Sequence, residues 1–172
     1  MTKEIIEGLD ITPGGRYIDA TLGEGGHTSK ILSESEPGGQ VLGIDADHEA
    51  VSVAKKRVNY SSDKFLAIND NFKNIRPIAV RYNFLPVHGI IFDLGVSSLQ
   101  LDAESRGFSF RRADPLDMRF SYNQNLSASQ IINNYDENEL ANLIFYFGEE
   151  KKSRKIARSI VRNRPIKSSL EL

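Results

Sequence analysis

A glycine-rich turn between a short apolar run and a helical pattern constrains this chain more than any other feature. The turn reads Asp19-Ala20-Thr21-Leu22-Gly23-Glu24-Gly25-Gly26-His27, and a helical pattern follows it as far as Ser35. In α/β proteins, a strand, a glycine-rich turn and a helix in this order bring the backbone close to a nucleoside ligand. Glycines permit the tight turn and leave space that a side chain would fill. The stretch therefore predicts a nucleoside site at one edge of a sheet.

Apolar runs alternate with helical patterns through the first half of the chain. We expect strands over residues 16–20, 40–45, 64–69 and 87–92, separated by helices over 25–35, after Asp47 and over 74–82, with a further helix over 2–9. This alternation predicts βαβ units with right-handed crossovers and a parallel sheet covered on both faces. It stops after Asp93. Helices are expected to begin after Ser127 and Asp136, and a basic helix to span 149–163, so a Rossmann-like α/β half precedes a helical segment.

Charge is distributed unevenly along the chain. Residues 1–104 carry 10 Lys and Arg against 15 Asp and Glu, a net charge of −5, whereas residues 105–172 carry 12 against 8, a net charge of +4. A basic second part suggests an anionic partner, although a solvated helical surface has the same composition. No apolar run is long enough to span a membrane and no signal-peptide pattern is present. The absence of cysteine fits a reducing compartment. The three histidines form no metal-ligand pattern, so we expect no metal.

Acidic and aromatic residues follow the expected strands. Asp45 ends the second strand 20 residues after Gly25, where a carboxylate binds ribose hydroxyls; the alternative role, capping the next helix, falls to Asp47. The third glycine of a dinucleotide fingerprint would fall at Thr28, so that fingerprint is not matched. Asp19, four residues before Gly23, gives instead an acidic residue, three residues and G-x-G, a pattern typical of S-adenosylmethionine enzymes.

Residues after the third and fourth strands complete the predicted site. After the third strand, Asp70 or Phe72 is predicted to contact adenine; Phe72 would stack on it, with burial in the core as the alternative. Asp93, after the fourth strand, is predicted near the reacting end of the ligand, because carboxyl ends of parallel strands meet at one edge of the sheet.

The second half carries long, unusual sequence runs. They are Asp93-Leu94-Gly95-Val96-Ser97-Ser98-Leu99-Gln100-Leu101-Asp102, Arg106-Gly107-Phe108-Ser109-Phe110, Pro115-Leu116-Asp117-Met118-Arg119 and Tyr146-Phe147-Gly148-Glu149-Glu150. With these runs the chain resembles the RsmH (MraW) family of ribosomal RNA small-subunit methyltransferases, from about Ile5 to Arg164. The resemblance implies S-adenosylmethionine as cofactor and methylation of the exocyclic N4 amine of a cytidine in 16S ribosomal RNA. Naked RNA and the assembled small subunit stay open as substrate, and the implied location is cytoplasmic, with no membrane partner.

The resemblance also implies roles for individual residues. The cofactor contacts that it implies are Gly25, Gly26, His27, Asp45, Phe72, Asp93 and Gln100, of which His27 and Gln100 rest on the resemblance alone. Asp93 is the candidate catalytic base, with binding of the methionine amino group as the alternative. Asp102 and Asp117 are further candidates, although Asp117 beside Arg119 suits an ion pair equally well.

Basic residues are the candidates for contact with RNA. Lys151 to Lys167 holds eight Lys and Arg and no acid, on a helix whose expected buried stripe is Ile156, Ala157, Ile160 and Val161. Arg111 and Arg112 stand beside two phenylalanines that suit stacking or packing. The RNA-binding candidates are Arg111, Arg112, Lys151, Lys155, Arg158 and Arg162.

The resemblance also implies a domain organisation. It implies a class I methyltransferase domain, a doubly wound, mostly parallel sheet over residues 1–104, and over 105–172 a linker and the start of an inserted helical substrate-recognition domain. The family's opening and closing segments are not matched, so we expect a fragment, with Ile90 to Phe92 left at a sheet edge and either poor solubility or a homodimer. Asp114 stands where the family pattern has glycine, and nothing in the sequence explains this difference.

Two alternative functions stay open beside the methyltransferase. One is a non-catalytic fragment that binds the cofactor or RNA. The other is a nicotinamide-dependent oxidoreductase, which shares the glycine-rich turn and Asp45.

Overall fold

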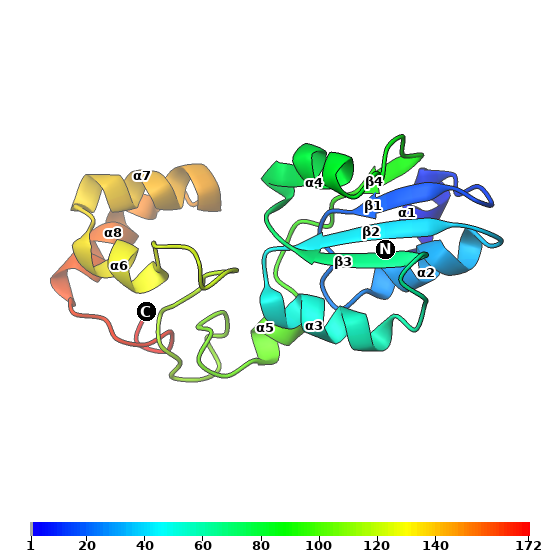
Figure 1. Cartoon of the computed structure of the whole chain (residues 1–172). Helices are drawn as coiled ribbons and strands as arrows, with labels where there is room; N and C mark the ends of the chain where they lie inside the picture. Colours follow the sequence, from blue (N-terminus) through cyan, green and yellow to red (C-terminus); the bar gives the residue numbers. More distant parts are fainter. Residues whose placement is uncertain (1) are drawn as a thin grey trace. The chain divides into compact units, whose positions relative to one another are not determined.

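The computed structural model describes residues 2–172, which form two compact units, the first ending at Ser97 and the second spanning Ser98–Leu172. The first unit contains four parallel strands in the order β3-β2-β1-β4 (Figure 1): β1 Arg16–Asp19, β2 Gln40–Asp45, β3 Phe65–Asn69 and β4 Gly89–Ile91. The order reverses between β1 and β4, so a crevice for ligands is expected at the carboxyl ends of these strands. The expected α/β class with a parallel sheet is confirmed.

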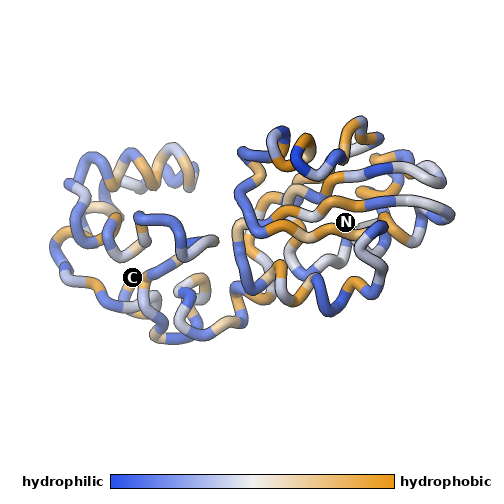
Figure 2. Tube along the Cα trace, viewed as in Figure 1, coloured by the Kyte–Doolittle hydropathy of each residue, from blue (hydrophilic) through white to orange (hydrophobic). Residues whose placement is uncertain are grey.

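Helices cover both faces of this sheet. Helices α1 Thr2–Leu9, α2 Gly26–Glu34 and α3 His48–Arg57 pack on one face, and α4 Ile75–Arg81, preceded by the 3-10 turn η1 Phe72–Asn74, packs on the other. Alternate strand residues supply the two cores: Tyr17 faces α2 and α3, and Ile18 faces α4. Figure 2 shows the hydrophobic stretches along the strands. Burial on both faces explains why these strands read as apolar runs.

The strand β4 lies at an edge of the sheet. It pairs with β1, and within residues 2–172 no other strand pairs with it. Ile91 is buried against α1, whereas Ile90 is 42% exposed and Phe92, just beyond the strand, is 50% exposed. The edge therefore presents apolar side chains and unpaired backbone groups, as the sequence predicted for Ile90 to Phe92.

The second unit is helical. It contains α5 Ser98–Asp102, α6 Ala128–Asn134, α7 Glu137–Gly148 and α8 Ser153–Arg162. The helix starts predicted after Ser127 and Asp136 are confirmed, and each of these two residues forms a capping box. Its core consists of Leu116, Ile132, Leu140, Ala141, Ala157, Ile160 and Ile166. Among the described residues, no helix combines the length and the apolar character that crossing a bilayer needs.

The expected basic helix over 149–163 is wrong at its start. Helix α7 ends at Gly148, and Glu149 adopts a left-handed conformation with φ +52°, which stops the helix because its hydrogen bonds cannot continue through that geometry. Helix α8 begins only at Ser153, so Lys151 belongs to a turn. The expected stripe is also wrong at Ile156, which is exposed, while Ala157 and Ile160 are buried.

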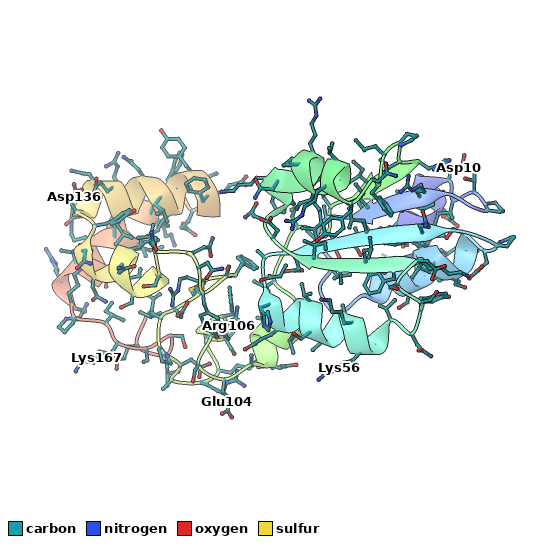
Figure 3. All side chains as sticks on the ribbon, in the orientation of Figure 1. Asp10, Lys56, Glu104, Arg106, Asp136 and Lys167 are labelled. Atoms are coloured by element: carbon teal, nitrogen blue, oxygen red, sulfur yellow. The ribbon has the colours of Figure 1, made fainter. Side chains whose placement is uncertain are left out.

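Arg106 organises the irregular segment of the second unit (Figure 3). Its buried guanidinium donates to the carbonyl oxygen of Arg119 at 3.0 Å and lies over the Tyr122 ring, 5.0 Å from the centroid. Arg119 in turn binds the Asp117 carboxylate through two hydrogen bonds of 2.9 and 2.8 Å, which lower the pKa of Asp117. Asp117 is therefore engaged in an ion pair, as its position beside Arg119 suggested.

Candidate cofactor site

The glycine-rich turn is attached to the end of β2. The backbone N–H of Gly23 donates to Asp45 Oδ2 at 2.8 Å, and Leu22 N–H donates to the carbonyl oxygen of Ile44 at 3.0 Å. The other oxygen of Asp45 accepts from Asp47 N–H at 2.9 Å. Burial raises the pKa of Asp45, against the lowering effect of these backbone donors. Asp45 thus positions the turn, and its half-buried carboxylate retains lone pairs for a ligand hydroxyl.

The adjacent glycines have different surroundings. Gly25 has φ +80°, and a Cβ there would lie 2.5 Å from Cγ2 of Val58, so the turn packs directly on the end of α3. A Cβ on Gly26 would meet nothing within 4 Å. Gly25 is also the N-cap residue of α2. Because glycine has no side chain, no side-chain acceptor binds the backbone N–H groups at the start of α2. Gly25 therefore serves packing, while Gly26 leaves room beside a helix start that attracts anionic groups.

Asp19 joins β1 to the first turn of α2. Its carboxylate is fully buried and accepts from Thr28 Oγ1 at 2.8 Å and from Thr21 N–H at 3.3 Å. Burial raises the pKa of Asp19, and the two donors partly offset this. The acidic residue of the sequence pattern is thus a support beneath the turn, and buried Thr28 occupies the place of the fingerprint's third glycine.

His27 and Asp93 meet at the reversal point of the sheet. His27 Nε2 lies 3.1 Å from Asp93 Oδ2, joining the first turn of α2 to the residue that follows β4. Asp93 N–H donates to Thr21 Oγ1 at 2.7 Å, which fixes the backbone at this point. Both residues were predicted from the sequence as cofactor contacts, but their contact with each other was not predicted. The roles of Thr21 and Thr28, whose signal was hydroxyl side chains on either side of the glycines, were missed as well.

Phe72 lies beyond β3 in η1. Its ring is 41% exposed and contacts the Phe92 ring edge to face, with centroids 5.7 Å apart. It is therefore not a buried core residue, the alternative considered for it. Asp70, by contrast, is used locally, because its Oδ1 accepts from Asn71 N–H and from Asn74 Nδ2 at 2.7 and 2.8 Å. Asp45, Phe72, Asp93 and the glycine turn thus all follow carboxyl ends of strands in one unit.

The remaining predicted residues belong to the second unit. Gln100 is buried on α5. Arg112 donates to the carbonyl oxygens of Leu101 and Ala103 at 3.2 and 3.0 Å and pairs with Asp114, so its guanidinium supports a loop. Arg158 pairs with Glu137 at 3.2 Å. The candidates Arg111, Lys151, Lys155 and Arg162 are exposed.

The whole chain matches one protein family. The model of the MraW methylase family covers residues 1–172. The chain belongs to the MraW methylase family. The resemblance inferred from the sequence runs is thereby confirmed, and with it a methylase rather than an oxidoreductase family.

Curated relatives in the MraW methylase family share this chain's sequence over its whole length. "Ribosomal RNA small subunit methyltransferase H" of Dehalococcoides mccartyi is 54% identical over 172 residues, which are 100% of this chain and 49% of that protein. The protein of the same name from Mycoplasma mycoides is 44% identical, over 100% of this chain and 56% of its own length. The chain thus spans about half the length of these relatives. A solved protein-L-isoaspartate O-methyltransferase is similar over 55% of this chain and 29% of its own, with 15% identity and a TM-score of 0.45, too weak a similarity for further argument.

Proposed function

We propose that this chain takes part in S-adenosylmethionine-dependent methylation of the N4 amine of a cytidine in 16S ribosomal RNA, with the first unit binding the cofactor. One observation carries the proposal: the glycine turn, the His27–Asp93 pair, Asp45 and Phe72 all follow carboxyl ends of strands in a parallel sheet. Membership of a methylase family and the printed names of the relatives support the reaction and the RNA substrate.

The residues present suit each part of this cofactor. Asp45 has a half-buried carboxylate for the ribose hydroxyls, and the exposed Phe72 ring offers a face to adenine. The start of α2 at Gly26 has no side-chain cap and suits the carboxylate of the methionine portion. When bound, the cofactor supplies a methyl group on a positively charged sulfur. These residues would bind and orient it.

Asp93 is the candidate for work at the reacting end. The cytosine amine is a weak nucleophile because its lone pair is delocalised into the ring, so transfer needs close placement and loss of a proton. The Asp93 carboxylate accepts that proton in one scheme and binds the methionine ammonium group in the other. In both, His27 holds the carboxylate in place through its 3.1 Å contact. The substitution Asp93→Asn separates the schemes: a loss of turnover at saturating cofactor supports the base role, and unchanged turnover assigns Asp93 to binding.

Two measurements test the proposal as a whole. Calorimetry should detect binding of S-adenosylhomocysteine and none of NAD, because buried Thr28 stands where the dinucleotide fingerprint needs glycine. Transfer of labelled methyl from the cofactor to immature small subunits should then be assayed for this chain and for one extended to the length of its relatives. Preferential NAD binding would refute the cofactor assignment. Cofactor binding without transfer by either chain would support the non-catalytic alternative.

The second unit is proposed to contact the RNA. The exposed cations Arg111, Lys151, Lys155 and Arg162 are available for phosphates, and Arg112 and Arg158 add charge while engaged within the unit. The affinity for single-stranded RNA should then fall with salt, with log K decreasing by about 0.7 per phosphate neutralised for each tenfold increase in salt. A flat salt dependence would remove this surface from the RNA interface.

A further inference from the structure

A cavity of about 390 Å³ lies at the turn between α7 and α8, in the second unit. Its volume falls within the range of about 300–1,000 Å³ typical of small-ligand sites. Phe145 and Tyr146 line it from the end of α7, together with the amide of Asn142. Neither aromatic residue was assigned a function from the sequence, and neither is among the predicted cofactor contacts.

The aromatic side chains of this cavity are unusually exposed. Tyr146 is 72% exposed although it is large and mostly apolar, and Phe145 is half exposed beside it. Their rings meet edge to face, with centroids 5.4 Å apart and an angle of 79° between planes. In an edge-to-face pair only one face of one ring is covered by the partner ring, so the pair itself leaves the other ring faces uncovered. Exposed aromatic faces of this kind are the platforms on which unpaired bases stack.

The charged side chains of the cavity all have one sign. Lys151, Lys152, Arg154 and Lys155 line it, and none of its lining residues is acidic. Within the described chain, none of these four cations forms an ion pair, in contrast to Arg158 one turn further along α8. Four like charges around one cavity repel each other, so an anionic occupant lowers their mutual repulsion.

We infer that this cavity is a subsite for one unpaired nucleotide of a single-stranded RNA segment. The base stacks on the Tyr146 ring, and the flanking phosphates bind Lys151 and Lys155. A nucleotide combines a flat ring and an anionic phosphate in one repeating unit, which is the combination that the cavity offers. An acidic peptide would match the charges but not the open ring faces. The inference rests on the proposed function, because it names how an RNA substrate is held.

The test uses the 172-residue chain and fluorescence anisotropy with two probes, a 12-nucleotide oligouridylate and an abasic RNA of the same length. The abasic probe keeps the phosphates and removes the bases. Oligouridylate should bind about 5- to 150-fold more tightly than the abasic probe, the range expected for stacking of one base. Tyr146→Ala should abolish most of this preference, and Tyr146→Phe should retain it, because the ring rather than the hydroxyl provides the stacking face.

Matched controls isolate the cavity. Phe147 is the next residue, is 87% exposed and does not line the cavity, so Phe147→Ala should leave the preference unchanged. Lys155→Ala should weaken both probes and reduce the salt slope by about 0.7, while Lys56→Ala, an exposed cation on α3 of the first unit (Figure 3), should not. Thermal melts followed by circular dichroism establish that each variant is folded; the exposure of the substituted side chains predicts unchanged midpoints.

Two results would overturn the inference. One is a preference for bases that Tyr146→Ala leaves intact in a folded protein. The other is binding of an acidic, phenylalanine-containing peptide that Tyr146→Ala abolishes while RNA affinity stays the same, which would assign the cavity to a protein partner. Failure of the wider proposal looks different, because a chain that binds neither RNA probe refutes the proposed contact of the second unit with single-stranded RNA. Binding of S-adenosylhomocysteine is measured separately and is not affected by either result.

Discussion

Replacing Gly25 by alanine should destabilise the first unit by about 2–5 kcal/mol. Two terms produce this figure. A residue with a Cβ at φ +80° costs about 1–2 kcal/mol relative to glycine. The new Cβ would also lie 2.5 Å from Cγ2 of Val58, whose side chain is buried and cannot simply move into solvent. Overpacking of this kind costs roughly 1–3 kcal/mol. Urea unfolding followed by circular dichroism measures the sum.

The double variant Gly25→Ala with Val58→Ala tests the origin of the effect. Truncating Val58 removes the atom that clashes, so the cost of Gly25→Ala in that background should fall to the backbone term of about 1–2 kcal/mol. Gly26→Ala is the matched control, because its Cβ meets nothing within 4 Å and alanine favours a helix start over glycine. Its stability should be equal to or above that of the wild type, whereas its affinity for S-adenosylhomocysteine should drop. A Gly25→Ala variant within about 0.5 kcal/mol of the wild type would refute the reasoning.

Three further predictions concern a buried acid, a buried base and the sheet edge. Burial raises the pKa of Asp19 in the folded chain, so the free energy of unfolding of the wild type relative to Asp19→Asn should rise as pH falls from neutral through that pKa, and level off below the unfolded value of 3.8. The gain is about 1.4 kcal/mol for each pH unit between the folded and unfolded pKa values, and parallel pH profiles of the two proteins in urea titrations would contradict it. Arg106→Met should cost roughly 1.5–3 kcal/mol, since it leaves the Arg119 carbonyl without its charged donor, and faster hydrogen exchange over residues 105–122 is the readout, with exposed Arg111→Met as control. The wild-type chain should self-associate through β4, and Ile90→Lys should reduce this in sedimentation velocity runs; a monomeric wild type at high concentration would count against an adhesive edge.

Much of the first unit could be predicted from the sequence because buried parallel strands leave continuous apolar runs. The runs at Tyr17, Val41 and Phe65 each mark a strand, and Asp47 marks the start of α3 as predicted. Helix α4 begins at Ile75, within one residue of the predicted start, although Pro77 stands in its first turn. Proline is tolerated there because the first helical turn does not need its N–H. Helix α5 was not predicted, since five residues are too few to show a period.

The site was predicted less completely than the fold, for a physical reason. Positions after strands could be read from order alone, which gave Asp45, Phe72 and Asp93. Contacts between residues far apart in sequence could not, because no local pattern marks them; the His27–Asp93 pair spans 66 residues. The end of α7 was missed because it depends on one left-handed residue, Glu149, that is not glycine or asparagine, the residues that usually mark such an end.

The break at residues 149–152 also determines the helical phase of everything after it. Tyr146 and Lys155 are nine residues apart, and in one uninterrupted helix they would point to opposite sides, about 900° of rotation and about 13.5 Å of rise apart. The turn resets this phase and brings both side chains to one cavity. Adding or removing a single residue in this turn would rotate α8 by about 100° relative to α7. The residues that line the cavity would all still be present, but they would no longer face the same side. The length of this turn is therefore more restricted than its composition.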